Sequence, residues 1–157
     1  MLSIKNIVFI DVNGKQLAAG KDYEKKIEYR DANGNLLGCF DTLADAVSIA
    51  CENKNSKLTL QKDIVTNAPQ DITYGKFTID LNGKSIVNKS TDIFEQDGFE
   101  IDRDAELTVM DSIGGGMIYA DQYCIVNDGV FKLNGGTIKG GFTGIAGGNN
   151  EQSTHCS

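Results

Sequence analysis

The chain has 157 residues, of which 40% are hydrophobic and 24% are charged, so it can form one globular domain with a sizeable core. Its net charge of −7 disfavours nucleic acids and anionic membranes as partners, because both reward clustered Lys and Arg. The 18 Gly and single Pro indicate many tight corners, and no apolar run is long enough to span a bilayer.

The amino terminus does not have the pattern of a signal peptide. Lys5 interrupts the apolar residues, and no small-residue cleavage site follows. We therefore expect the chain to be cytoplasmic as it stands, or exported as part of a longer protein, and its localisation stays unassigned. Ile7–Ile10 predicts a first strand, and Asn13-Gly14 predicts a turn.

A β-hairpin is predicted next. Lys26–Arg30 has the composition of a strand, and Asn33-Gly34 turns the chain into Leu36-Leu37. The segment Asp31–Asn35 resembles the start of a calcium loop but lacks its glycine and its final glutamate. A hairpin turn facing solvent explains it better.

One helix is predicted, over Thr42–Asn53. Thr42 and Asp45 resemble a capping box, with Asp in place of the usual Glu. An apolar face repeats at spacings of three and four residues and comprises Leu43, Ala46, Val47 and Ala50. We expect residues 1–56 to form an α/β cap whose helix covers apolar residues and strand edges at the start of the following segment.

Residues 57–148 contain a repeated unit of strand, turn and isoleucine. Phe77–Leu81 alternates apolar and polar residues, Asn82-Gly83 turns the chain, and Ile86 returns to the apolar layer. Similar units end at Ile118 and Ile138, and Leu58–Ile64 is a degraded earlier copy. The predicted equivalent positions are Leu81, Met110 and Leu133, and then Ile86, Ile118 and Ile138. The predicted core includes Ile79, Leu81, Val109 and Leu133.

Shorter repeats lie between the main ones. Ile93-Phe94 leads to Asp97–Ile101, and Cys124–Val126 leads to Asp128–Val130. Each unit therefore carries more than one short strand with a turn at each corner. This organisation favours a parallel β-helix over an antiparallel sandwich, which short strands and Asn-Gly turns also permit.

The motifs Thr78–Ile86, Leu107–Ser112 and Leu133–Ile138 resemble the right-handed parallel β-helix of the pectate-lyase-like superfamily. The resemblance is closer to non-catalytic repeats in large surface proteins of gut bacteria and in some phage proteins, and it covers roughly Leu58–Gly148. It implies a mainly β fold, namely a short right-handed parallel β-helix with an N-terminal hairpin and one capping helix. It implies little about activity, because fold does not determine function.

The leading functional expectation is a non-catalytic recognition or structural module of a bacterial surface or phage protein that binds a glycan or a protein. The candidate binding residues are Tyr119, Asp121 and Tyr123. If Ile118–Cys124 is one strand, all three point the same way, and two tyrosines beside a carboxylate could hold a sugar. The alternative is a turn whose tyrosines cover the flank of the repeats.

Two other functions stay open, and neither is preferred. Asp102-Arg103-Asp104 places two carboxylates beside an arginine, as in a polysaccharide lyase, where they could hold calcium or share a proton. The other alternative is an acidic intracellular phage or mobile-element protein that inhibits a host protein. It would present a row of carboxylates consisting of Asp80, Asp102, Asp104, Glu106 and Asp111.

No metal site or cofactor is predicted. Cys39, Cys51, Cys124 and Cys156 form no C-x-x-C pair, and the single histidine is His155, so buried thiols are expected. Asn88-Lys89-Ser90 is a glycosylation sequon that matters only in a eukaryotic secretory setting.

The carboxyl end has no evident cap, since residues 149–157 form a polar tail without apolar periodicity. Uncovered strands are templates for further pairing. We therefore predict that the last repeat, Val130–Ala146, is covered by another copy of the chain or by further repeats of a longer protein.

Overall fold

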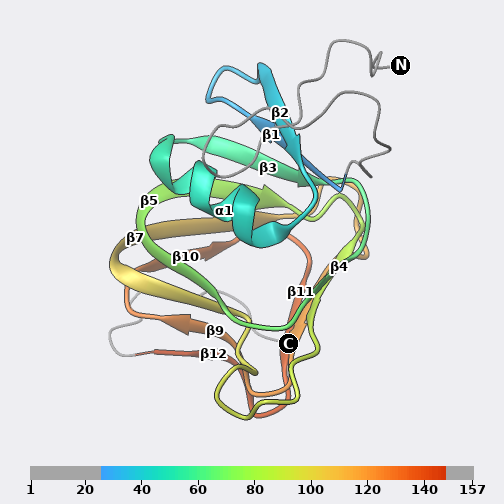
Figure 1. Cartoon of the computed structure of the whole chain (residues 1–157), viewed down its shortest axis with the longest axis vertical. Helices are drawn as coiled ribbons and strands as arrows, with labels where there is room; N and C mark the ends of the chain where they lie inside the picture. The colour runs from blue at the N-terminus through green and yellow to red at the C-terminus, as the bar shows by residue number, and fades with distance from the viewer. Residues whose placement is uncertain (1–25, 148–157) are drawn as a thin grey trace.

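The computed structural model describes residues 26–147, which form a mainly β structure with one helix (Figure 1). The helix α1 spans Leu43–Glu52. The strands are β1 Ile27–Arg30, β2 Leu36–Phe40, β3 Ser56–Leu60, β4 Ile64–Thr66, β5 Gln70–Asp80, β6 Ser85–Asn88, β7 Phe99–Met110, β8 Met117–Ala120, β9 Tyr123–Asn127, β10 Val130–Leu133, β11 Thr137–Gly140 and β12 Thr143–Ala146. The predicted strand Ile7–Ile10, the turn at Asn13-Gly14 and the tail 149–157 lie outside the described residues. Within the described range, no helix is long and apolar enough to cross a membrane.

The strands form two sheets. The long sheet has the order β12-β9-β7-β5-β3-β1-β2, with β10 also paired to β7, and the short sheet has the order β11-β8-β6-β4. From β3 onward every pairing is parallel. From β3 onward the chain crosses from the long sheet to the short sheet and back, and in this part only β9 and β10 follow each other within one sheet. This parallel pairing contradicts an antiparallel sandwich for this part of the chain.

A column of isoleucines runs across the short sheet. The residues that pair in register from β4 to β11 are all buried, and they are Ile64, Ile86, Ile118 and Ile138. The predicted equivalence of Ile86, Ile118 and Ile138 is therefore confirmed, and so is the earlier copy that ends at Ile64.

The predicted equivalence of Leu81, Met110 and Leu133 is wrong. Met110 pairs with Asp80, and Leu133 pairs with Val109, which itself pairs with Ile79. The turns that lead from the long sheet to the short sheet differ in length, and the one between β7 and β8 is the longest. Residues that lie the same number of positions before Ile86, Ile118 and Ile138 therefore do not occupy equivalent positions in the long sheet.

The first described strands form the predicted hairpin. β1 and β2 pair antiparallel, and Gly34 between them has a φ of +83°. The Asp31 carboxylate accepts hydrogen bonds from the Asn33 and Asn35 backbone N–H groups, both at 2.9 Å. The side chain of Asn35 also donates to Asp31, and these contacts lower the pKa of Asp31. This segment is therefore a self-contained turn.

Helix α1 forms where it is predicted. The Thr42 hydroxyl accepts a hydrogen bond from the Asp45 backbone N–H at 3.3 Å and caps the first turn. The predicted apolar face is buried, comprising Leu43, Ala46, Val47 and Ala50. The helix lies against β5, where Gly75 has a φ of +93° and a Cβ would lie 2.5 Å from the Cys51 carbonyl oxygen. The edge of β3, however, is paired by β1 and not covered by the helix.

The core lies between the two sheets and beneath the helix, and its largest side chains include Phe77, Phe99 and Phe131. The predicted core residues Ile79, Leu81 and Val109 are fully buried, whereas Leu133 is only half-buried. Leu133 lies on β10, which has a partner strand on one side only among the described residues. The three described cysteines, Cys39, Cys51 and Cys124, are buried.

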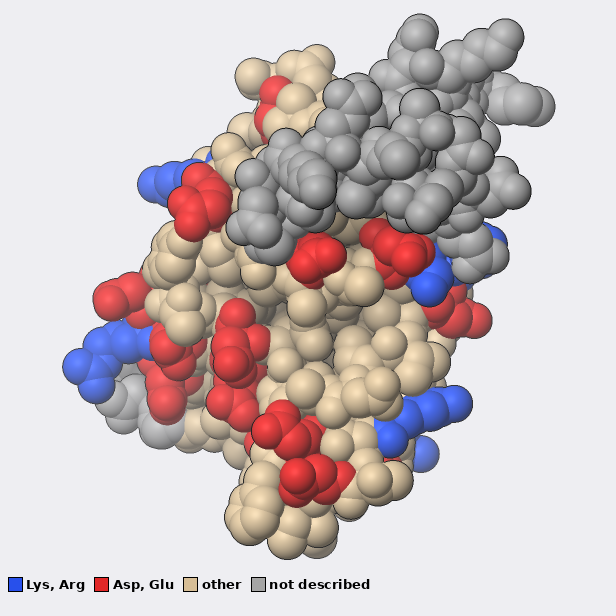
Figure 2. All heavy atoms as spheres, in the orientation of Figure 1, with Lys and Arg blue, Asp and Glu red and all other residues tan. Residues whose placement is uncertain are grey.

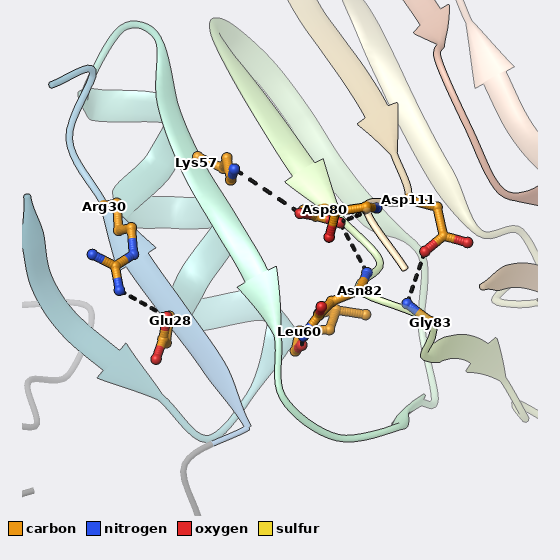
Figure 3. Close-up of polar contacts among 9 residues, drawn as sticks. Glu28, Arg30, Lys57, Leu60, Asp80, Asn82, Gly83 and Asp111 are labelled. Carbon is orange, nitrogen blue, oxygen red and sulfur yellow. Dashed lines mark hydrogen bonds and ion pairs between the residues drawn. The ribbon is translucent and has the colours of Figure 1, made fainter. Parts of the chain in front are cut away.

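Carboxylates tie the corners of successive strands together (Figure 3). Asp80 accepts hydrogen bonds from the backbone N–H groups of Asn82 at 2.9 Å and Ser112 at 3.0 Å, and it lies 3.9 Å from the Lys57 ammonium. Asp111 accepts from three glycine N–H groups: Gly83 at 2.8 Å, Gly114 at 3.1 Å and Gly116 at 2.7 Å. Each corner is therefore fixed by a side chain from a neighbouring strand.

Candidate functional site

The loop 89–98 between β6 and β7, here called the corner loop, is held from inside by one amide. Asn88 is 3% exposed, and its Nδ2 donates to the carbonyl oxygens of Glu95 at 2.7 Å and Asp97 at 2.6 Å. Its Oδ1 accepts from the Ser90 N–H at 2.9 Å. The Asn88 amide is thus hydrogen-bonded within the protein on both its oxygen and its nitrogen, and these bonds hold the loop backbone in place.

The corner loop is also bound to the two turns that stack beside it. Gln122, in the turn between β8 and β9, donates through Nε2 to the Ile93 carbonyl at 2.6 Å. The Asp97 carboxylate accepts from the Tyr123 N–H at 3.0 Å. In the turn between β11 and β12, the Phe142 N–H donates to the Gln122 carbonyl at 3.1 Å. Three successive corners therefore lie side by side.

Large apolar side chains project from these stacked corners into solvent. Ile93 is 62% exposed, Phe94 83%, Phe142 75% and Tyr123 37%. The rings of Tyr123 and Phe142 lie 6.3 Å apart between centroids, inclined at 43°. We call these four residues the aromatic corner. Exposed apolar side chains on a rigid backbone, grouped instead of scattered, are the usual mark of an interaction surface.

The predicted binding residues do not share one face of one strand. The strand breaks at Asp121-Gln122, so Tyr119 lies on β8 in the short sheet and Tyr123 on β9 in the long sheet. The Tyr119 hydroxyl donates to the Asp121 carboxylate at 2.9 Å, which raises the pKa of Tyr119. The structure therefore brings Tyr119 and Asp121 together, whereas Tyr123 belongs to the aromatic corner.

Carboxylates gather beside the aromatic corner. The pKa of Glu100 is raised, first because the carboxyl is partly buried, and then because other carboxylates lie near it: Asp71, Asp97, Asp102 and Glu95. We call these five residues the acidic flank. Figure 2 shows Asp and Glu gathered over the middle and lower part of one face, with Lys and Arg at its sides.

Neutralising Glu100 is expected to stabilise the protein at neutral pH. Because the pKa of Glu100 is raised, its charged form costs stability at pH 7, and this cost disappears below the pKa of an ordinary glutamate, about 4.3. Glu100→Gln should therefore raise the free energy of unfolding at pH 7 by about 0.3–1 kcal/mol. Thermal unfolding at pH 7 and pH 4 measures it. Asp45→Asn, the same charge change in the first turn of α1, should give no gain. A gain of equal size at both pH values would contradict a raised pKa of Glu100, whether burial or the neighbouring carboxylates cause it.

The tract Asp102-Arg103-Asp104 lies within β7. All three residues are exposed, and the pairing of β7 with β5 is irregular beside them. β9 pairs with β7 before this tract and β10 pairs after it. Arg103 lines an open hollow of about 360 Å³ with Lys54, Lys76 and Glu106. Within residues 26–147, no group of three or more potential ligands is placed to hold a metal.

The predicted row of surface carboxylates is not formed by the residues proposed for it. Asp80 and Asp111 bind backbone N–H groups at the corners. Glu106 lies between Lys132 at 2.7 Å and Lys76 at 3.4 Å, and the hydrogen bond from Lys132 lowers its pKa. Asp102 and Asp104 are exposed on β7, and of the predicted set only Asp102 belongs to the acidic flank.

A second cavity, of about 330 Å³, lies at the amino end of α1, and none of the four residues of the aromatic corner lines it. Its ionisable groups are engaged with other groups. Lys26 lies 3.7 Å from Asp41, and Asp63 accepts from the Ser85 N–H at 2.9 Å. We do not assign a site to it.

No family model, curated protein or solved structure matches the chain. The candidate site therefore depends on the geometry alone. The sequence patterns did not indicate that Ile93, Phe94 and Phe142 are exposed, because Ile93-Phe94 has the composition of a short strand between the main repeats. The neighbouring residues Asp92 and Glu95 break the apolar alternation that a buried strand would show.

Proposed function

We propose that the chain is a short right-handed parallel β-helix that serves as a non-catalytic recognition or structural module of a bacterial surface or phage protein. The architecture is supported by the repeated crossing between the two sheets and by the parallel register of successive strands. Parallel strands joined by a crossover are almost always right-handed, which supports the proposed hand.

The aromatic corner is the observation that carries the recognition role. Its apolar side chains cost free energy while they face water, and a ligand that covers them recovers it. The corner loop is held by Asn88 and Gln122, so its side chains are already arranged and little entropy is lost on binding. The ligand classes that this surface could take are a glycan and a protein.

Recognition is preferred to catalysis because the polar groups at this corner are already bonded within the protein. Asp97 holds the Tyr123 N–H, and Gln122 holds the Ile93 carbonyl. The alternative lyase activity would use Asp102-Arg103-Asp104. Calcium-dependent cleavage of a polyuronide that is lost in Asp102→Ala would favour it over the module proposed here.

The test is binding of the purified chain to a glycan array and to a displayed random-peptide library. Ligands of the aromatic corner should bind the double variant Phe94→Ser/Phe142→Ser at least about tenfold more weakly, because both apolar contacts are lost. Ile113→Ser is the matched control, since Ile113 is 74% exposed at another corner. Loss of binding in Tyr119→Ala alone would favour the Tyr119–Asp121 pair as the site.

Self-association through the last strands is part of the proposal. Among the described residues, β10, β11 and β12 each pair with a strand on one side only. Such edges are templates for pairing with a second copy or with further strands of a longer protein.

Ile145 tests the self-association. It lies half-buried on β12, in register with Ile125. Light scattering at micromolar concentration should show a dimer or a larger species, and Ile145→Lys should shift it towards monomer, because a charge would have to be buried. Val65→Lys, at an exposed position on β4, is the control. A wild-type protein that stays monomeric at every concentration would contradict the association.

A further inference from the structure

We infer that the aromatic corner and the acidic flank form one docking surface for a basic protein segment that carries an apolar anchor. This inference rests on the recognition role proposed above and adds the chemical class of the partner. The anchor would pack on Phe94 and Phe142, and Lys or Arg side chains of the partner would face the carboxylates.

The two parts of this surface are joined by Asp97. Its carboxylate accepts the Tyr123 N–H at 3.0 Å, and its charge also acts on Glu100. Glu100 in turn pairs in register with Asp71 on β5. A partner that covers the apolar side chains of the corner therefore comes within reach of the flank.

The acidic flank is not neutralised from within the described part of the chain. No ion pair there joins any of the five carboxylates to a cation. Along the sequence, Lys and Arg are absent from residues 63–75, 90–102 and 104–131. Charge complementarity steers partners and selects among them, so an unbalanced acidic surface favours a basic one.

A protein fits this surface better than a neutral sugar does. A sugar site needs polar side chains that converge on hydroxyl groups, but Asp97, Gln96 and Gln122 are already bonded to the chain's own groups. What remains exposed is mainly apolar, namely Ile93, Phe94 and Phe142. Aromatic contacts at the centre with charged groups around them are typical of protein interfaces.

The experiment selects peptides from a displayed random library on the intact wild-type chain. Selected peptides should combine apolar residues with Lys or Arg. Synthetic copies of these peptides should bind the Phe94→Ser/Phe142→Ser variant at least about tenfold more weakly than the wild type. They should bind the Asp71→Asn/Glu95→Gln variant several-fold more weakly. Added salt should weaken binding to the wild type by a factor similar to that of the Asp71→Asn/Glu95→Gln variant, because salt screens the same charges. Ile113→Ser and Asp45→Asn/Asp104→Asn are the matched controls, and copies with Lys and Arg replaced by Gln should bind weakly.

The outcomes separate this inference from the recognition role. Neutral or acidic peptides that still need Phe94 and Phe142 would overturn the basic partner and leave the recognition role intact. If glycans bind at the aromatic corner and no peptide is enriched, the basic partner is likewise overturned and the recognition role is retained. Ligands of either class that are indifferent to Phe94 and Phe142 would overturn both.

Discussion

Replacing Leu81 with alanine should lower the free energy of unfolding by about 2–5 kcal/mol. Leu81 is fully buried, directly after β5. A Cβ built on Gly116 would lie 2.7 Å from the Leu81 Cβ, and one built on Gly136 would lie 2.6 Å from its Cδ1. The side chain therefore packs against the backbone of two later corners, which have no side chain with which to fill the space that alanine leaves.

Urea unfolding followed by circular dichroism measures this loss. Leu37→Ala is the matched control, because Leu37 is 46% exposed on β2 and its truncation leaves no cavity. A Leu81→Ala variant that unfolds within about 0.5 kcal/mol of the wild type would be inconsistent with the packing of these corners.

The second large effect is expected at Asp111. Asp111→Ala removes the acceptor for three glycine N–H groups at one corner, and we expect a loss of about 2–4 kcal/mol at pH 7, since hydrogen bonds to a charged group are stronger than neutral ones. Asp111→Asn keeps one acceptor oxygen and should lose less. Asp104→Asn, an exposed carboxylate on β7, is the control for the change in charge.

The loss at Asp111 should depend on pH. Burial raises the pKa of Asp111, but the hydrogen bonds from Gly83, Gly116 and Gly114 together outweigh this and lower it. Its carboxylate therefore stabilises the fold fully above the pKa of an ordinary aspartate, about 3.9, and this stabilisation is lost as the pH falls through the lower folded-state pKa. Wild type and Asp111→Asn should converge in acid. A difference in unfolding free energy that stays constant between pH 7 and pH 2.5 would contradict this account.

Local patterns predicted the parts of the fold that local interactions determine. The helix follows from the capping residue Thr42 and from apolar spacing, the hairpin from Asn33-Gly34, and the isoleucine column from the recurrence of the repeat. The register of the long sheet could not be predicted in the same way, because it depends on how many residues each turn takes before the chain returns. That number differs between β5–β6 and β7–β8.

The candidate site was harder to predict than the fold. Ile118–Cys124 alternates apart from Gln122, a polar residue at an inward position, and this single departure does not by itself show that the chain passes from one sheet to the other at Asp121-Gln122. Asp80 looks like a solvated charge in the sequence, yet it binds an N–H group at Ser112, which only the stacking of strands brings near. Exposed apolar residues such as Phe94 are indistinguishable from core residues by composition.

Asn88 holds the backbone of the corner loop, and the apolar side chains that the loop exposes take no part in these bonds. The amide bonds to backbone groups at Ser90, Glu95 and Asp97, so the shape of the loop does not depend on which side chains stand at positions 93 and 94. Those two positions contribute little to the core, since both side chains face solvent. If the aromatic corner binds a ligand as proposed, substitutions there can alter what it binds at small cost to folding. A scaffold built in this way allows specificity to diversify in evolution, or by engineering, while the strands beneath it stay the same.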